Sequence, residues 1–133
     1  MFKGKKVKQR GDVVDKEIMK GSIDILLLSI VSKRDMYGYE MVKTLKHNSG
    51  ELYNMGEGTL YPALKRLENK KWLESYWDNP EVGARRKYYC ITDTGKKELA
   101  RKLQEWEKIS DLIKVSSEGM AWIKPLKPTL GKS

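Results

Sequence analysis

The sequence predicts a mainly α-helical fold with a β-hairpin wing: a winged helix-turn-helix domain followed by a long C-terminal helix. Three observations predict this class. Three stretches with the helical period come first, two short aromatic β-prone segments follow, and a long charged stretch with one apolar stripe comes last. This is the element order of a winged helix-turn-helix, in which the third helix enters the major groove and the hairpin lies beside it.

The first helix is predicted from about residue 15 to residue 33, and it is apolar on most sides, as expected of a central helix. Its apolar run, "IDILLLSIV" at residues 23–31, is far shorter than the roughly 20 residues needed to cross a bilayer. We therefore interpret it as a buried helix and expect no membrane span. Residues 1–14 precede it as a basic arm or a solvated tail, with the cations Lys3, Lys5, Lys6, Lys8 and Arg10.

The second helix is predicted within "MYGYEMVKTLKHNSG", where Met41, Val42 and Leu45 are in helical phase and the final Asn-Ser-Gly ends the helix. The third helix is predicted to begin at Gly58 or Thr59 and to end near Lys70. No catalytic pattern occurs in either helix, so we ask which partner their exposed surfaces could bind.

The two sides of the third helix differ sharply when residues are placed 100° apart. One side is apolar and is predicted to be buried; it consists of Leu60, Ala63, Leu64 and Leu67. The opposite side offers cationic donors and an aromatic hydroxyl; it carries Gly58, Pro62, Lys65 and Asn69, flanked by Tyr61 and Arg66. Pro62 is placed in the first turn, where a missing N–H removes no helical hydrogen bond.

The hairpin is predicted from "WLESYW" and "RRKYYCIT", which are separated by the turn segment "DNPEVGA". Arg85, Arg86 and Lys87 follow the turn consecutively, with two tyrosines behind them. Together with the outward side of the third helix they form a basic strip interleaved with aromatic residues. Such a strip is typical of a protein that binds duplex DNA.

The fourth helix is predicted from residue 93 to residue 115, with Thr92 as its cap. Its apolar stripe resembles a coiled-coil seam and consists of Leu99, Leu103, Trp106, Ile109 and Ile113, with Leu112 alongside. Because so short a seam is not stable alone, we expect it to pack against the first helix and against a second copy. A two-fold dimer places two recognition helices about one DNA turn apart. Residues 116–133 show no periodicity and are interpreted as a flexible tail.

Composition limits the function classes further. The 133 residues carry a net charge of +9, which favours a polyanionic partner. One cysteine, Cys90, and one histidine, His47, leave no intrachain disulfide and too few ligands for a zinc site, and a free thiol fits a reducing cytoplasm. We find no nucleophile–base or carboxylate pair, so we expect neither an enzyme nor a cofactor.

Three motifs, "YGYEMVKTL", "GTLYPALKRLE" and "RRKYYCITDTGKKEL", resemble the PadR family of bacterial transcriptional regulators, in order and over about residues 18–113. The resemblance, closest to the compact subgroup with a single C-terminal helix, implies a dimeric winged-helix repressor. By position, it implies that the DNA-facing residues of the recognition helix are Thr59, Tyr61, Pro62 and Lys65. The wing residues that would hold the DNA backbone are Arg85, Arg86 and Lys87.

Two positions depart from the family pattern, and a third is of interest for ligands. Lys71 stands where the family often has Gly, so the third helix must end with a non-Gly residue. Cys90 replaces a common basic residue; strand packing is favoured over redox sensing for this thiol. The resemblance implies that Trp106 lines a pore at the dimer centre and stacks on planar aromatic ligands; the alternative is that it fills the interface.

The sequence therefore favours a cytoplasmic repressor that binds a palindromic operator as a dimer and is released by a small aromatic ligand. A second class remains open, a winged-helix module that uses the same basic strip to bind an acidic protein partner. A membrane-surface protein is less favoured, because the N-terminal lysines lack an amphipathic partner face.

Overall fold

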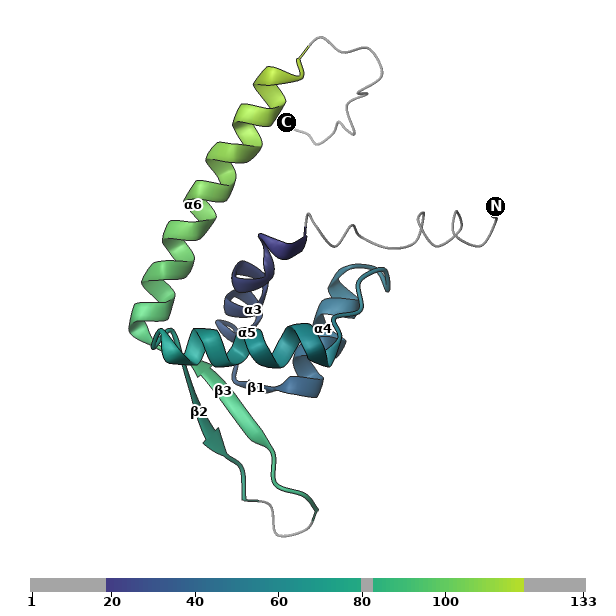
Figure 1. The fold of residues 1–133 in the computed structure, drawn as a ribbon, viewed down its shortest axis with the longest axis vertical. Coiled ribbons are helices and arrows are strands. Elements are labelled where there is room, and N and C mark those ends of the chain that lie inside the picture. The colour runs from purple at the N-terminus through teal and green to yellow at the C-terminus, as the bar shows by residue number, and fades with distance from the viewer. Residues whose placement is uncertain (1–18, 80–82, 119–133) are drawn as a thin grey trace, which may run out of the picture. The chain divides into compact units, whose positions relative to one another are not determined.

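The computed structural model describes residues 19–79 and 83–118 and confirms the predicted fold class, a mainly helical chain with a β-hairpin (Figure 1). The chain forms two compact units, Met1–Lys102 and Leu103–Ser133, so the boundary falls inside the last helix. The elements, in order, are α3 (Ile23–Val31), β1 (Met36–Tyr37), α4 (Gly38–Asn48), α5 (Glu57–Asn69), β2 (Leu73–Trp77), β3 (Lys87–Ile91) and α6 (Asp93–Ser116).

The first predicted helix is corrected at its beginning. Residues 19 and 20 are helical, but Gly21 and Ser22 form a turn, and α3 begins only at Ile23. The apolar pattern continues through this turn, which is why periodicity alone did not show the break. Residues 15–18, the predicted arm and most of the predicted tail lie outside the described residues. Within the described ranges, no helix is long and apolar enough to span a bilayer.

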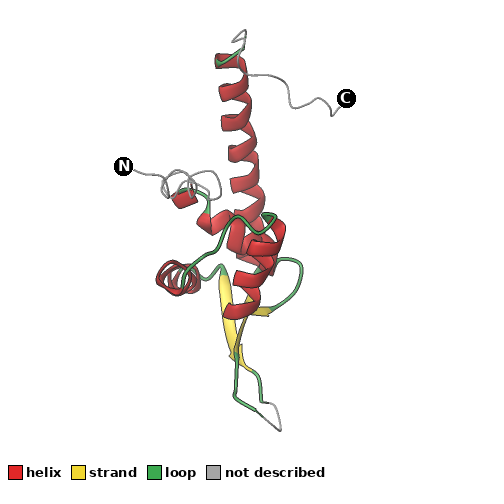
Figure 2. Cartoon of the chain, turned by 90° about the vertical axis from the view of Figure 1, so that its right-hand side faces the viewer, coloured by secondary structure: helices red, strands yellow, loops and turns green. Residues whose placement is uncertain are grey.

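The hairpin proves to be part of a three-stranded antiparallel sheet with the order β1-β3-β2. Met36 pairs with Tyr89 and Tyr37 with Tyr88, while β2 pairs with β3 along its whole length. β1 was not predicted, and its residues were assigned to the second helix, because a two-residue strand has no periodicity to detect. Figure 2 shows the strands beside the helices of the first unit, with the hairpin extending beyond them.

The core of the first unit is built around α3, whose Leu27 and Leu28 are fully buried. The predicted buried face of α5 is confirmed, since its four apolar residues are at most 2% exposed. Leu99 of α6 also joins the core, at 9% exposure. The core therefore fixes which side of α5 remains available to a partner.

The end of α5 explains how a helix stops without glycine. Lys71 adopts a left-handed conformation, with φ of 68°. Its N–H donates to the Glu68 carbonyl at 3.0 Å, and the N–H of Trp72 donates to the Leu67 carbonyl at 3.1 Å. These two bonds make a Schellman motif, which usually has glycine at the left-handed position. The expectation that α5 terminates at a non-Gly residue is confirmed.

The start of α6 is held against the same junction. The Thr92 hydroxyl accepts the N–H of Gly95 at 2.9 Å and donates to the carbonyl of Lys71 at 2.7 Å. This confirms Thr92 as the cap. Gly95 is buried so close to the Trp72 carbonyl that a methyl group there would collide with backbone. The wing and both flanking helices are therefore joined through one short set of backbone contacts.

Candidate nucleic-acid interface

The outer surface of α5 carries the predicted helix residues, since Thr59, Tyr61, Pro62 and Lys65 are all exposed. One detail of the prediction is corrected. Because α5 begins at Glu57, Pro62 lies inside the helix rather than in its first turn. Pro62 therefore lacks the N–H that would bond the Gly58 carbonyl, and that carbonyl lies on an exposed part of the helix.

Tyr61 also contacts another helix, which the period of α5 alone did not predict. Its side chain is 47% exposed, but its hydroxyl lies directly against Gly38, the first residue of α4. Any side chain at Gly38 would collide with this hydroxyl. Tyr61 therefore joins the start of α4 to α5 while part of its ring stays accessible.

The last turn of α5 is fixed by two charged side chains. Arg66 binds the Asp24 carboxylate of α3 at 2.6 Å, so this flanking cation is partly neutralised. Glu68 accepts a hydrogen bond from the Ser75 hydroxyl of β2. The second contact also shows which face of the sheet is turned towards α5.

The face of the sheet on the α5 side carries a second exposed aromatic residue. Trp77 lies two residues after Ser75, so its side chain is on the same face, and it pairs with Lys87. Trp77 is 52% exposed. The Arg85 guanidinium lies 4.9 Å from the centre of the Trp77 ring. We call this surface, defined by Trp77, Arg85 and Lys87, the α5-side face of the wing.

The opposite face of the sheet carries a row of three tyrosines, one from each strand, which we call the tyrosine row: Tyr37, Tyr88 and Tyr76. The rings of Tyr37 and Tyr88 meet edge to face with centroids 5.4 Å apart, and those of Tyr76 and Tyr88 stack at 5.7 Å. The Arg86 guanidinium lies 4.8 Å from the Tyr37 ring centre. The structure thus places Arg86 on the other side of the hairpin from Arg85.

The tyrosine row is anchored at Asp35, the residue before β1. The Tyr76 hydroxyl donates to the Asp35 carboxylate at 2.6 Å. This hydrogen bond, with burial and the negative charge of Asp35, raises the pKa of Tyr76 to about 12. Because its pKa is raised, the phenol stays protonated over a wider range of pH than an ordinary tyrosine and keeps this donor position.

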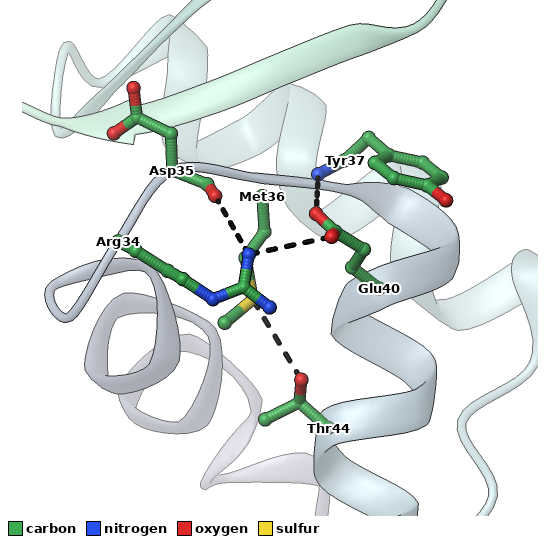
Figure 3. Close-up of polar contacts among 6 residues, drawn as sticks. All are labelled: Arg34, Asp35, Met36, Tyr37, Glu40 and Thr44. Carbon is green, nitrogen blue, oxygen red and sulfur yellow. Dashed lines mark hydrogen bonds and ion pairs between the residues drawn. The ribbon is translucent and has the colours of Figure 1, made fainter.

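The start of α4 is fixed by a group of polar contacts (Figure 3). The Glu40 carboxylate accepts the backbone N–H of Tyr37 at 3.2 Å and binds Arg34 at 3.4 Å. Figure 3 shows the Asp35 carboxylate pointing away from this group, which leaves it available to Tyr76. An acidic residue in the first turn also suits the positive end of the helix dipole. These contacts hold the surface on which Tyr61 rests.

Cys90 lies in β3 opposite Glu74 and is only partly accessible. Burial raises the pKa of its thiol, with smaller contributions from the charges of Asp35 and Glu74. A raised pKa keeps the sulfur in its less reactive thiol form. This environment fits strand packing better than redox sensing.

The second unit contains the C-terminal part of α6, and its apolar stripe is exposed. The exposed fractions are 48% for Leu103, 44% for Trp106, 54% for Ile109, 64% for Leu112 and 60% for Ile113. A stripe of large apolar side chains on one helix face, left in water, indicates a protein contact surface. Leu99, at the other end of the predicted seam, is instead in the core of the first unit.

A concave surface occurs in the first unit as well. A groove of about 560 Å³ lies between α3 and α4, where Leu26, Ile30, Leu45 and Tyr53 form much of its apolar lining. Trp106 is not among its lining residues. The groove belongs to the first unit, whereas Trp106 belongs to the second.

These elements define a class of protein. Two helices joined by a turn, with α5 exposing a cationic and aromatic surface beside a winged hairpin, constitute a winged helix-turn-helix of the DNA-binding type. Residues 27–101 match the model of the PadR-like family of transcriptional regulators. The chain belongs to this family.

Solved structures and curated relatives agree with this assignment. The chain is 45% identical to a PadR family transcription regulator from Clostridium difficile R20291, with a TM-score of 0.62 over 69% of this chain and 94% of that one. It is 37% identical to a transcriptional regulator from Clostridium thermocellum, with a TM-score of 0.69 over 73% and 94%. It is 25% identical over 88 residues to the negative transcriptional regulator PadR of Bacillus subtilis (strain 168); the match covers 66% of this chain and 48% of that regulator.

Proposed function

We propose that this protein is a dimeric repressor that binds a palindromic DNA operator through α5 and the wing. The observation that carries the proposal is the exposed surface of α5, where Thr59, Tyr61, Pro62 and Lys65 all lie outside the buried apolar face. In the major groove, Lys65 would donate to a guanine edge, while Arg85 and Lys87, on the face of the wing towards α5, would neutralise phosphates. The Bacillus subtilis relative is a negative transcriptional regulator, which favours repression over activation.

The exposed stripe of α6 supports the dimer. Packing Leu103, Trp106, Ile109 and Ile113 against the same residues of a second copy would remove their apolar surface from water. A two-fold axis through such a seam gives two copies of α5 and hence a palindromic site. A cytoplasmic location follows from this function.

One experiment tests the proposal against the alternative of a module for an acidic protein partner. Binding is measured on the DNA upstream of the protein's own gene, and on a scrambled duplex, over a range of salt concentrations. A repressor gives a footprint with two symmetric half-sites and an affinity that falls steeply with salt. Equal, weak binding to both duplexes would contradict operator recognition and favour the acidic partner.

We further propose a planar aromatic effector that stacks on Trp106 and releases the operator. The observation behind it is that this indole is 44% exposed. Trp106→Ala separates a ligand wall from an interface core. If Trp106 forms the core, truncation costs about 3–5 kcal/mol of dimer stability. If it forms a ligand wall, the dimer persists, while planar dyes no longer bind or displace the operator.

A further inference from the structure

The three consecutive cations of the wing are not equivalent, although the sequence treats them alike. The Arg85 guanidinium lies over the Trp77 ring and the Arg86 guanidinium lies over the Tyr37 ring, and these two rings are on opposite faces of the sheet. The assignment of faces rests on the strand register and on one contact. Ser75, which shares its face with Trp77, donates a hydrogen bond to Glu68 of α5.

We infer that Trp77 is a positioning residue for DNA binding: it holds Arg85 on the α5-side face of the wing, where a DNA strand passes α5. Arg86 has a structural role on the tyrosine row instead. The inference rests on the proposed function, because it assumes that the duplex lies along α5. It adds a residue, Trp77, that the motif comparison did not single out.

Trp77 is more exposed than its place in a strand requires. A tryptophan at the end of a short strand is 52% exposed, and it lies beyond the apolar core. Trp77 contributes to the fold only at the exposed end of the β2–β3 pair, where it is the cross-strand partner of Lys87. Its ring instead provides a flat surface for the Arg85 guanidinium at 4.9 Å.

The chemistry of the Trp77–Arg85 pair suits it to phosphate binding. Tryptophan is the best aromatic partner for a cation, and a guanidinium most often fills this role. A guanidinium that stacks through its face keeps its N–H donors in its own plane, directed to the sides. Those donors match the oxygens of a phosphate group. The Trp77 ring therefore limits the freedom of Arg85 without occupying its donors.

Arg86 has a different position from Arg85. Its guanidinium lies 4.8 Å above Tyr37, the residue that leads from β1 into α4. The N–H of Asp78 donates to the Arg86 carbonyl at 2.8 Å, so its backbone continues the pairing of the hairpin. Arg86 thus connects the wing to the first residues of α4 on the face that points away from α5.

The test measures affinity for a mixed-sequence duplex as a function of salt concentration, with the full chain. The single variants are Arg85→Ala, Arg86→Ala, Trp77→Ala and Trp77→Phe. The double variant combines Trp77→Ala with Arg85→Ala. Arg85→Ala should reduce the salt slope by about 0.9, which is roughly an eightfold loss of affinity at 0.1 M salt. Trp77→Ala should lose affinity in the same direction, and Trp77→Phe should recover most of it. In the Arg85→Ala background, Trp77→Ala should have no further effect.

The matched control is Arg86→Ala, which should leave the salt slope unchanged while lowering the thermal midpoint. Thermal unfolding of each variant shows whether the wing still folds. Losses that add fully in the double variant, or a salt slope that depends on Arg86 and not on Arg85, would overturn the inference while leaving DNA binding intact. If the wild-type chain binds no duplex, the proposed function fails and the inference fails with it.

Discussion

Helices α5 and α6 have similar amphipathic patterns, but their apolar sides have different environments. In α5, Leu64 and Leu67 are fully buried within the chain, and the opposite side is exposed. In the C-terminal part of α6, Leu103 and Ile109 are 48% and 54% exposed. The same amphipathic pattern therefore gives either a buried or an exposed apolar side, depending on whether the chain itself covers that side. On α5 the polar side is available to a partner; on α6 it is the apolar side.

The largest expected effect is on the stripe of α6. Leu103→Asp would place a carboxylate within the proposed seam, where an unpaired buried charge costs about 3 kcal/mol or more. Sedimentation equilibrium should show monomer, and operator binding should be lost. Gln104→Asp is the control, because it adds the same charge on the side of α6 away from the stripe. A Leu103→Asp dimer of unchanged affinity would mean that this stripe does not form the interface.

The next effect contrasts the two apolar sides directly. Leu64→Ala should lower the free energy of unfolding by about 2–5 kcal/mol, because it leaves a cavity in the core. That loss should be independent of protein concentration. Ile109→Ala should instead destabilise the protein in a concentration-dependent way, because its packing depends on association. Denaturant titrations at two protein concentrations distinguish them; the same concentration dependence for both variants would break the comparison.

A smaller effect is expected on the polar side of α5. Lys65→Ala should weaken operator binding by about 1–3 kcal/mol if the ammonium group donates to a base edge, with a smaller change on random duplex. Lys108→Ala, which removes an exposed lysine from α6, should have little effect on either duplex. Fluorescence titrations measure both. Operator affinity equal to that of the wild type would exclude Lys65 from base recognition.

The smallest effect sharpens the account of where α5 ends. Lys71→Gly should stabilise the protein by about 1 kcal/mol, because glycine adopts the positive φ of this position without steric cost. Lys70→Gly, one residue earlier and at φ of −81°, should destabilise it instead. Thermal unfolding detects both signs. A destabilised Lys71→Gly variant would show that the lysine side chain contributes more than its backbone strain costs.

Much of the fold was predictable because local pattern determines it. The bounds of α5 and α6 were predicted within a residue or two, since caps and apolar spacing act over a few neighbouring residues. The hairpin followed from β-prone segments around a turn. The break before α3 and the strand β1 were missed, because one is hidden in a continuous apolar pattern and the other is too short for any period.

The site was predictable only in part. The outward residues of α5 followed from helical geometry, because the buried side of a helix determines the exposed one. The Tyr61 contact with Gly38 and the different faces of Arg85 and Arg86 required coordinates. Each of these contacts joins elements whose relative positions depend on strand register and helix packing. A signal was available for one of them, since alternation along β2 places Ser75 and Trp77 on the same face.

Local sequence patterns were enough to identify the family, the order of helices and wing, the basic character of the surface and the apolar stripe of α6. These properties are encoded in neighbouring residues or in their period, so no distant contact is needed to read them. Three features could be seen only in the three-dimensional structure. Met36 and Tyr37 add a third strand to the sheet, and Arg66 is bound by Asp24. Arg85 and Arg86 lie on opposite faces of the wing. The physical reason is that these contacts join residues from different elements, and their geometry is set by the packing of the whole core.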